Sequence, residues 1–314
     1  MASCGGKQDT FSAWSCSKSM HGWIMLTWRL VMLTVVCQAM GQGDKAALII
    51  IDVQECFLEE GSQPVPDGKE VIPVINRIRS VYEDAFSLVV LSQDWHCSDH
   101  VSFASQHPGH RPYDVVTLQY DSEGHLCASL SVPPSYPYAH SCSQVHYNIS
   151  QSLWPNHCIM NVTAGPTSSA IDSRLTRKPS DEIVWKGNNC EVDSYSAFNS
   201  NGGLRHTRLH RLLQRHDITV VYVVGLALDY CVYYTSLDAH GLGYKTYTIV
   251  DATRGIAANT TQEAVSDLKT KGIHVIQSSS LAGLLSVSGG PAVHTQSHME
   301  YLLHLLCIIY VYVS

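Results

Sequence analysis

Short, unbroken runs of hydrophobic residues alternate along the chain with longer segments in which hydrophobic positions recur every three or four residues. The unbroken runs are too short for helices and predict strands buried on both faces, at 45–53, 86–94, 183–185, 218–225, 245–251 and 274–277. The segments between them predict helices at 69–82, 204–215, 231–241 and 261–271. Because strand and helix alternate, the pattern predicts an α/β fold in which helices cover both faces of a parallel sheet.

One polar stretch, residues 107–180, breaks this alternation. It is rich in Tyr, Ser, His and Pro and shows little periodicity, so we interpret it as a loop-rich insertion. The chain contains no internal repeat and no Gly-x-Gly-x-x-Gly phosphate loop. We therefore expect a single domain over residues 42–288.

Composition narrows the classes of function. With 314 residues, 45% of them hydrophobic, the chain can bury a large core. Its net charge of −7, with no basic stripe, argues against binding to nucleic acid. Nucleic-acid binding is therefore set aside, while the sequence leaves the oligomeric state open.

The first 41 residues have the layout of a secretory signal peptide. Cations precede a short apolar core at 30–37, and the small residues Ala39 and Gly41 follow it as a cleavage site. An uncleaved signal anchor is the alternative, but the apolar run 23–37 is short and is interrupted by an arginine. We therefore predict that the protein enters the secretory pathway.

The C-terminal residues 289–314 have the order of a GPI-attachment propeptide. Small residues at 288–290 are followed by a polar spacer, 291–300, and by an apolar tail, 301–313. A buried C-terminal strand or helix is the alternative. A GPI signal would place the protein outside the cell or on its surface, attached to the membrane through a lipid anchor. Three Asn-x-Ser/Thr sequons fit the same route and mark candidate glycosylation sites at Asn148, Asn161 and Asn259.

An odd number of cysteines remains in the expected mature chain. Of the 11 cysteines, four fall in the two segments expected to be removed: Cys4, Cys16, Cys37 and Cys307. The seven that remain leave one thiol unpaired if the others form disulfides outside the cell, and Cys231 is the candidate. Spacing does not show which of the other cysteines pair.

Cys231 stands where the strand at 218–225 gives way to a predicted helix, in the stretch VVGLALDYCVYYT. In open α/β sheets, ligands bind beyond the carboxyl ends of the strands, and a helix N-terminus can lower the pKa of a thiol. This position suits a catalytic nucleophile. The alternative is a small buried cysteine, since cysteine is among the most buried residue types.

Asp52 and Lys186 occupy equivalent positions, at the ends of the predicted strands 45–53 and 183–185. Parallel strands share one carboxyl edge, so these two residues can meet Cys231 although they are far from it in sequence. Together the three would supply a base, an electrostatic helper and a nucleophile. Taken singly, each has a plainer explanation, because a strand-end Asp often caps a turn and a lone Lys is usually a solvated surface charge.

Candidate metal ligands follow the predicted strand at 86–94. Asp94 and His96 are two residues apart, and just beyond a strand this spacing points both side chains the same way. His157, in WPNHC, is a candidate third ligand and His100 a fourth. Three protein ligands with an open position are typical of catalytic metal sites. The set favours zinc, although iron or manganese suits similar ligands and chance pairs are expected among 17 histidines.

Five motifs together resemble one known family more specifically than any of them does alone. They are DVQECF (52–57), QDWHCSDHVSFAS (93–105), WPNHC (154–158), WKGNNCEVDSYSAF (185–198) and VVGLALDYCV (223–232). In order and spacing they resemble the nicotinamidases of the isochorismatase-like (cysteine hydrolase) superfamily, over nearly all of residues 45–280. The resemblance implies a three-layer α/β/α fold with a six-stranded parallel sheet.

The resemblance also implies roles for individual residues. It makes the strand-end residues a catalytic triad: Asp52, Lys186 and Cys231. It makes the acid and the histidines metal ligands: Asp94, His96 and His157, with His100 where some members add a histidine. A cis peptide between Leu226 and Ala227 would aim the N–H of Ala227, beside that of Cys231, at an oxyanion, while Phe57 and Trp154 match positions whose rings sandwich a pyridine.

The implied function is hydrolysis of nicotinamide to nicotinate and ammonia through a cysteine thioester, with a divalent metal. The alternatives are another amidase of the superfamily, acting on a different small carboxamide, and a non-catalytic secreted module that binds pyridines. Three features depart from the family pattern: a longer stretch between 106–109 and 154–158, the secretory signals, and acidic residues around Asp193 that match no motif position.

Overall fold

The computed structural model describes residues 44–285. The predicted signal peptide at 1–41 and the predicted GPI-attachment segment at 289–314 lie outside the described residues, as do Cys4, Cys16, Cys37 and Cys307. Within the described range, no helix combines the length and the apolar character needed to cross a membrane.

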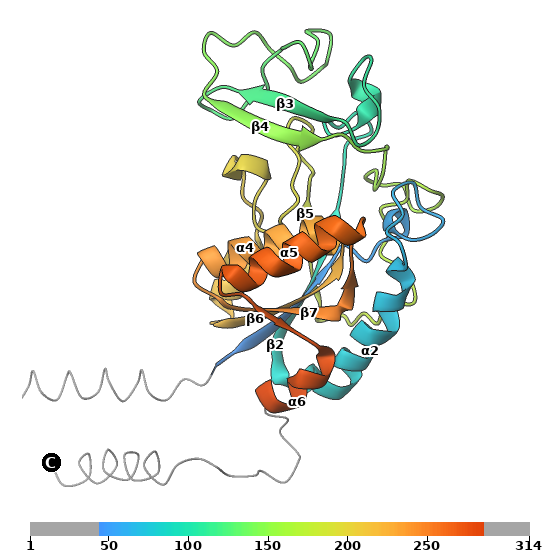
Figure 1. Ribbon diagram of the computed structural model, residues 1–314, viewed down its shortest axis with the longest axis vertical. Coiled ribbons are helices and arrows are strands. Elements are labelled where there is room, and N and C mark those ends of the chain that lie inside the picture. The colour runs from blue at the N-terminus through green and yellow to red at the C-terminus, as the bar shows by residue number, and fades with distance from the viewer. Residues whose placement is uncertain (1–43, 286–314) are drawn as a thin grey trace, which may run out of the picture. The chain divides into compact units, whose positions relative to one another are not determined.

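Six parallel strands form the central sheet, in the order β5-β2-β1-β6-β7-β8 (Figure 1). Their bounds are β1 Ala46–Ile51, β2 Phe86–Asp94, β5 Glu182–Lys186, β6 Val220–Leu226, β7 Lys245–Arg254 and β8 His274–Ile276. The chain runs outward from β1 through β2 to β5, then crosses to β6 on the other side of β1 and runs outward again. The strand order therefore reverses between β1 and β6, and in such sheets ligands bind at the carboxyl ends of the strands at this point.

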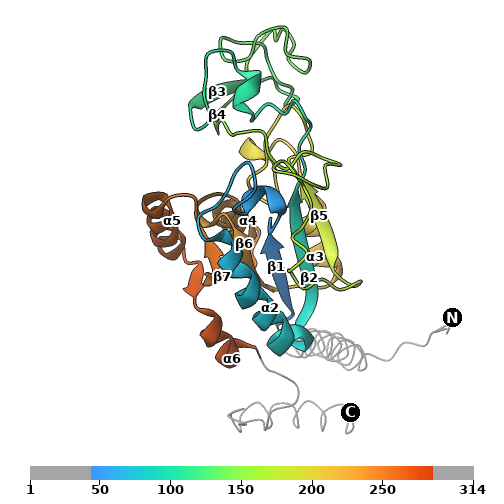
Figure 2. The same cartoon turned by 90° about the vertical axis from the view of Figure 1, so that its right-hand side faces the viewer.

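Helices cover both faces of this sheet (Figure 2). Side chains of α2 and α6 pack with one set of alternating residues of β1, and side chains of α3 and of the α4 region pack with the other set. Helix α5 lies beside α4. The bounds are α2 Val71–Tyr82, α3 Leu209–Arg215, α4 Tyr233–Gly241, α5 Ala258–Thr270 and α6 Leu281–Leu284. The predicted three-layer α/β/α fold with a six-stranded parallel sheet is confirmed.

Two helices begin at residues other than those predicted. Helix α3 begins at Leu209 rather than at residue 204, because the residues just before it pair with an earlier segment: His206 forms an isolated bridge with Asn199, and the Thr207 N–H donates to the Phe198 carbonyl at 2.8 Å. The helix predicted from residue 231 begins earlier, with a wide π-helical turn over Leu228–Val232 that precedes α4. Cys231 therefore lies inside this wide turn.

Residues 107–180 are more than a loop. They contain β3 (Val115–Tyr120) and β4 (Tyr147–Ser152), which pair in antiparallel fashion. Alternate residues of β3 pack in a second, smaller core with Leu126 and Tyr136. The alternation is short and β4 is mostly polar, so sequence periodicity does not reveal these strands. Figure 1 shows the β3–β4 unit beyond the carboxyl ends of the sheet strands.

Three disulfides join six of the cysteines: Cys56–Cys158, Cys97–Cys190 and Cys127–Cys142. Cys231 is the one unpaired cysteine among the described residues, and it is buried. The prediction that Cys231 is the free thiol is confirmed, and packing decides the pairing that spacing left open.

Candidate active site

Four reactive side chains meet where the strand order reverses. Asp52 follows β1, Asp94 ends β2, Lys186 ends β5, and Cys231 lies in the turn after β6. All four are buried, and Cys231 is the most exposed of them at 8%. The carboxyl edge of the sheet thus gathers two acids, a cation and a thiol that are widely separated in sequence.

The Lys186 ammonium contacts each of the other three groups. Its Nζ lies 2.9 Å from Asp52 Oδ2, 3.0 Å from Asp94 Oδ1 and 3.4 Å from Cys231 Sγ. It also donates a hydrogen bond of 2.9 Å to the backbone oxygen of Ser194. One buried cation therefore faces two carboxylates beside the thiol.

Ser92 holds the Asp52 carboxylate and was missed by the sequence reasoning. Its hydroxyl donates to Asp52 Oδ1 at 2.6 Å, and its oxygen accepts the Asp52 backbone N–H at 3.1 Å. The sequence does contain a signal that could have identified Ser92: it is a polar residue inside a buried strand, and it lies two positions before Asp94 and so on the same face of β2.

Burial decides the direction of the pKa shift for Cys231 and Asp52, and the neighbouring charges decide it for Lys186. It raises the pKa of the Cys231 thiol well above the usual range, and the Lys186 ammonium offsets this only in part. Burial also raises the pKa of Asp52, against the opposing charge of Lys186. Burial alone would lower the pKa of Lys186, but the neighbouring carboxylates raise it well above its usual range. The net shift of the thiol pKa is therefore upward, opposite to the lowering that a helix N-terminus would produce by itself.

The turn that carries Cys231 is anchored to a neighbouring helix. Asp229 accepts hydrogen bonds from the backbone N–H of Ile256, at 2.9 Å, and from Thr260 Oγ1, at 2.5 Å, at the start of α5. The Leu226–Ala227 peptide bond at the start of the turn is cis. The sequence reasoning did not assign Asp229, although an acid two residues before a candidate nucleophile was the available signal.

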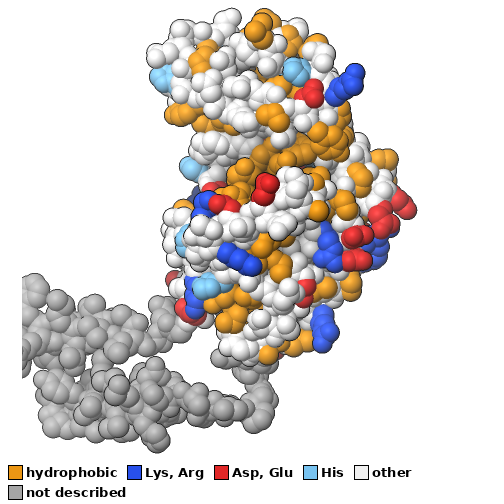
Figure 3. Space-filling model, viewed as in Figure 1, with side chains coloured by type: hydrophobic (Ala, Val, Ile, Leu, Met, Phe, Trp, Pro, Cys, Tyr) orange, Lys and Arg blue, Asp and Glu red, His pale blue; other side chains and the backbone are white. Residues whose placement is uncertain are grey.

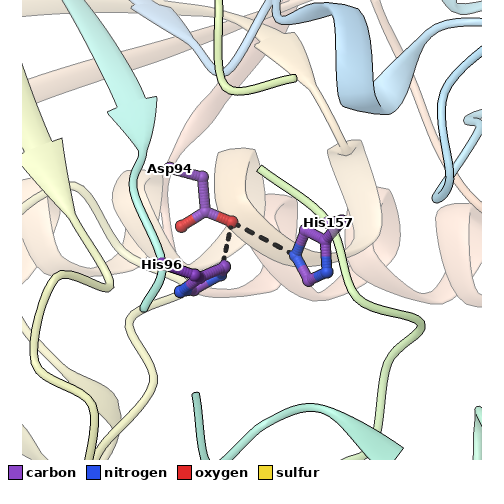
Figure 4. A group of neighbouring side chains, drawn as sticks. All are labelled: Asp94, His96 and His157. Carbon is purple, nitrogen blue, oxygen red and sulfur yellow. Dashed lines mark ion pairs between the residues drawn. The ribbon is translucent and has the colours of Figure 1, made fainter. Parts of the chain in front are cut away.

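Asp94, His96 and His157 form one compact group (Figure 4). Asp94 Oδ2 lies 2.9 Å from His96 Nε2 and 3.4 Å from His157 Nε2. The other ring nitrogen of each histidine faces a backbone carbonyl at 2.8 Å, that of Gly187 for His96 and that of Pro155 for His157. A carbonyl only accepts, so each Nδ1 carries a proton, and in the neutral ring each Nε2 presents a lone pair. His96 Nε2 is buried with no hydrogen-bond partner in the part of the chain that the structure describes, which fits a place for a divalent cation.

His100 lies against His96 but outside this group. The two ring centroids are 4.1 Å apart. His100 Nε2 faces the carbonyl of Asn189 at 2.9 Å, and its Nδ1 faces Ser102 Oγ at 2.8 Å. The structure therefore groups His100 with His96 and Asp193, whose possible ligand atoms lie within 4.8 Å of one another, and not with Asp94 and His157.

Cys231 faces a pocket of about 380 Å³, its open mouth included. Phe57 and Trp154, the predicted ring-binding residues, both line it. So do Tyr195 and Tyr230, and the Tyr230 ring centroid lies 4.9 Å from that of Trp154 and 5.5 Å from that of Tyr195. The walls are therefore aromatic above a floor that holds a thiol.

The sequence reasoning missed the two tyrosines and gave Asp193 no role. Asp193 lines the pocket and accepts a hydrogen bond of 2.9 Å from Gln151 Nε2, which also donates to the Tyr195 hydroxyl at 3.1 Å. Gln151 belongs to β4, so these bonds join the β3–β4 unit to the pocket wall. Figure 3 shows hydrophobic side chains gathered at the waist between this unit and the rest of the domain.

Comparison with known proteins decides the family. The isochorismatase domain family matches residues 137–280. The nicotinamidase of Acinetobacter baylyi is 32% identical over 240 residues, which cover 76% of this chain and 95% of that protein. The chain belongs to the nicotinamidase family. It is an amide hydrolase that cleaves C–N bonds, and a non-catalytic pyridine-binding module is not favoured.

Solved structures of nicotinamidases share the fold. The yeast nicotinamidase bound to the inhibitor nicotinaldehyde is 29% identical, with a TM-score of 0.63 over 74% of this chain and 99% of that chain. The pyrazinamidase of Pyrococcus horikoshii in complex with zinc is 27% identical, with a TM-score of 0.52 over 74% of this chain and 99% of that chain. Both align over nearly their full length, so the nicotinamidase unit lies within this chain.

Proposed function

We propose that this enzyme hydrolyses nicotinamide to nicotinate and ammonia through a thioester on Cys231. One observation carries the proposal: the buried Lys186 ammonium contacts both the Cys231 sulfur, at 3.4 Å, and the Asp52 carboxylate, at 2.9 Å, and Cys231 lines an aromatic pocket. The relatives support the choice of amide, since the A. baylyi protein is a nicotinamidase and the yeast one binds nicotinaldehyde.

Acylation begins with a proton transfer inside the buried group. Asp52 accepts the Cys231 proton, and Lys186 neutralises the resulting thiolate. The sulfur attacks the amide carbon, while the N–H groups of Ala227 and Cys231 hold the oxyanion, an effect of about 2.7–4 kcal/mol per donor in comparable sites. Asp52 returns the proton to the amide nitrogen, the C–N bond breaks and ammonia leaves.

Deacylation uses the same carboxylate. Asp52 takes a proton from a water molecule, whose oxygen attacks the thioester carbon. The C–S bond breaks, the proton passes to the Cys231 sulfur, and nicotinate leaves. A base with a raised pKa suits both half-reactions, because it accepts a proton readily and releases it again.

The pocket walls orient the substrate. Phe57 and Trp154 hold the faces of the pyridine ring. Asp94, His96 and His157 would hold a divalent ion, with zinc favoured and iron or manganese suited to the same donors. The ion would supply a binding site for the pyridine nitrogen. The zinc complex of the P. horikoshii pyrazinamidase supports this choice of ion.

The test of the reaction is ammonia release by the purified protein. Nicotinamide should be hydrolysed, and Cys231→Ala should abolish turnover without changing the zinc content. Unchanged turnover in this variant would refute the thioester. A panel of other small carboxamides decides whether nicotinamide is the preferred substrate.

The metal assignment has its own test. Asp94→Ala should lose zinc and raise KM for nicotinamide, and benzamide, which lacks the ring nitrogen, should be a poorer substrate than nicotinamide for the native enzyme. Full zinc occupancy in Asp94→Ala, or equal KM values for the two amides, would contradict the assignment.

We further propose that the protein acts outside the cell or on its surface. Six of the seven cysteines in the described range are paired, which is typical of secreted proteins. The asparagines of all three sequons are exposed: Asn148, Asn161 and Asn259. Glycosidase treatment should increase gel mobility, and a phosphatidylinositol-specific phospholipase should release the protein from intact cells. Retention after phospholipase treatment would contradict the GPI anchor.

A further inference from the structure

Two of the three disulfides end one residue away from a proposed metal ligand. In the Cys97–Cys190 disulfide, the first cysteine directly follows His96. In the Cys56–Cys158 disulfide, the second cysteine directly follows His157. Each proposed histidine ligand therefore has its own covalent cross-link.

The far ends of these disulfides also lie at the site. Cys56 directly precedes Phe57, which lines the pocket. Cys190 ends a short segment in which the Gly187 carbonyl faces His96 Nδ1 at 2.8 Å. This segment packs closely on the ligand, since a side-chain carbon at Gly187 would lie 2.4 Å from the His96 ring. The two disulfides thus link the segments that carry His96 and His157 covalently to segments that line the pocket or contact the His96 ring.

Backbone hydrogen bonds join the same segments. The His96 N–H donates to the Cys158 carbonyl at 3.0 Å, and the Met160 N–H donates to the His96 carbonyl at 2.8 Å. Residues 153–160 contain neither a helix nor a strand, only isolated bridge pairs. His157 therefore depends on cross-links for its position, whereas Asp94 is held by the sheet.

We infer that the Cys97–Cys190 and Cys56–Cys158 disulfides are positioning cross-links for the histidine ligands, and that metal binding is tight only when both are closed. The inference rests on the metal site of the proposed function. The cross-links span 93 and 102 residues and so restrict segments that the chain alone leaves far apart. An ion that meets ordered ligands does not have to order two loops, and its affinity is higher for that reason.

The third disulfide provides a matched control. Cys127–Cys142 closes a span of 15 residues within the β3–β4 unit, and neither of its cysteines is adjacent to a proposed ligand. Removing this disulfide is the same chemical change as removing either of the other two, but it occurs at cysteines that are not next to a proposed metal ligand.

The experiment compares three double variants of the full chain. Cys97→Ser with Cys190→Ser and Cys56→Ser with Cys158→Ser open the two site disulfides, and Cys127→Ser with Cys142→Ser is the control. Zinc dissociation constants are measured by competition with a chelator, at a temperature well below each unfolding transition. We expect a rise of about tenfold or more in each site variant, as for other groups that orient metal ligands, no change in the control, and recovery of turnover in excess zinc.

Two results would overturn the inference: zinc dissociation constants in the site variants equal to those of the native protein and the control, or lost turnover that saturating zinc does not restore. If a site variant is not recovered folded, the native protein is partially reduced and alkylated instead. Zinc should then be lost from molecules alkylated at Cys97 and Cys190 and kept by molecules alkylated only at Cys127 and Cys142. Retention of zinc by both kinds of molecule would also overturn the inference. Failure of the proposed function is distinct, because the native protein would then release no ammonia from nicotinamide.

Discussion

The floor of the pocket and the part of its wall that carries Trp154 and His157 are positioned by different parts of the fold. The floor consists of Asp52, Lys186 and Cys231, at the carboxyl ends of β1, β5 and β6. The wall includes Trp154 and His157, from an irregular stretch that follows β4. Continuous sheet hydrogen bonds hold the floor, whereas isolated hydrogen bonds and a disulfide hold the wall. Groups that exchange protons thus lie at the ends of hydrogen-bonded sheet strands, whereas Trp154 and His157 lie on an irregular segment.

The difference separates the expected effects of mutation. Changes in the floor should lower kcat or the free energy of unfolding and leave zinc binding intact. Changes in the wall should raise KM or the zinc dissociation constant and leave kcat nearly intact.

Asp52→Asn should have the largest effect. It removes the proposed general base with little change in shape, so kcat should fall by about 10²- to 10⁴-fold while zinc content stays constant. Steady-state ammonia release and metal analysis measure both quantities. Asp217→Asn is the control, because that side chain is 61% exposed and lies outside the site. A variant of Asp52 that kept kcat and lost zinc would reverse the assignment of floor and wall.

Lys186→Met should destabilise the fold. It leaves the buried Asp52 and Asp94 carboxylates without their shared cation, which should lower the free energy of unfolding by about 3–5 kcal/mol. Guanidinium unfolding measures the change. Lys178→Met, which breaks a partly exposed pair with Glu83, should cost about 1 kcal/mol or less. Equal losses of unfolding free energy in the two variants would show that the ion pairs of the floor contribute no more to stability than the Lys178–Glu83 pair.

Trp154→Ala should affect the wall alone. Loss of one aromatic face should raise KM for nicotinamide by up to about tenfold, with kcat nearly unchanged. Trp154→Phe keeps a ring and should restore most of the affinity. A fall in kcat with constant KM would mean that Trp154 acts on the chemistry rather than on binding.

Ser92→Ala should have the smallest effect, confined to the pH profile. Burial raises the pKa of Asp52 above its ordinary value of 3.8, so kcat/KM should fall at a higher pH than for a free carboxyl as the base becomes protonated. The Ser92 hydrogen bond lowers this pKa, so its loss should move the acid limb to higher pH, by about one pH unit or less. At pH values well above the acid limb, kcat/KM should not change. A shift of the limb to lower pH would contradict the assignment of Asp52 as the base.

Prediction from the sequence succeeded where the signal is local and failed where it is not. Unbroken apolar runs located the sheet strands, and β2 has the predicted bounds 86–94. The strands β3 and β4 were missed because each is short and β4 is largely polar, so their pairing depends on the partner strand rather than on their own pattern. The late start of α3 depends on the pairing of residues 206–207 with residues 198–199, which only the folded chain shows.

The sequence by itself determined the α/β class, the free thiol and the set of residues at strand ends, because hydrophobic periodicity and cysteine parity are properties of neighbouring residues and of counts. The tertiary structure decided which cysteines pair, that both ring nitrogens of His100 have protein partners, and that burial raises the pKa of Cys231. Each of these depends on distances and solvent exclusion between segments that are remote in sequence, and no local pattern contains such information.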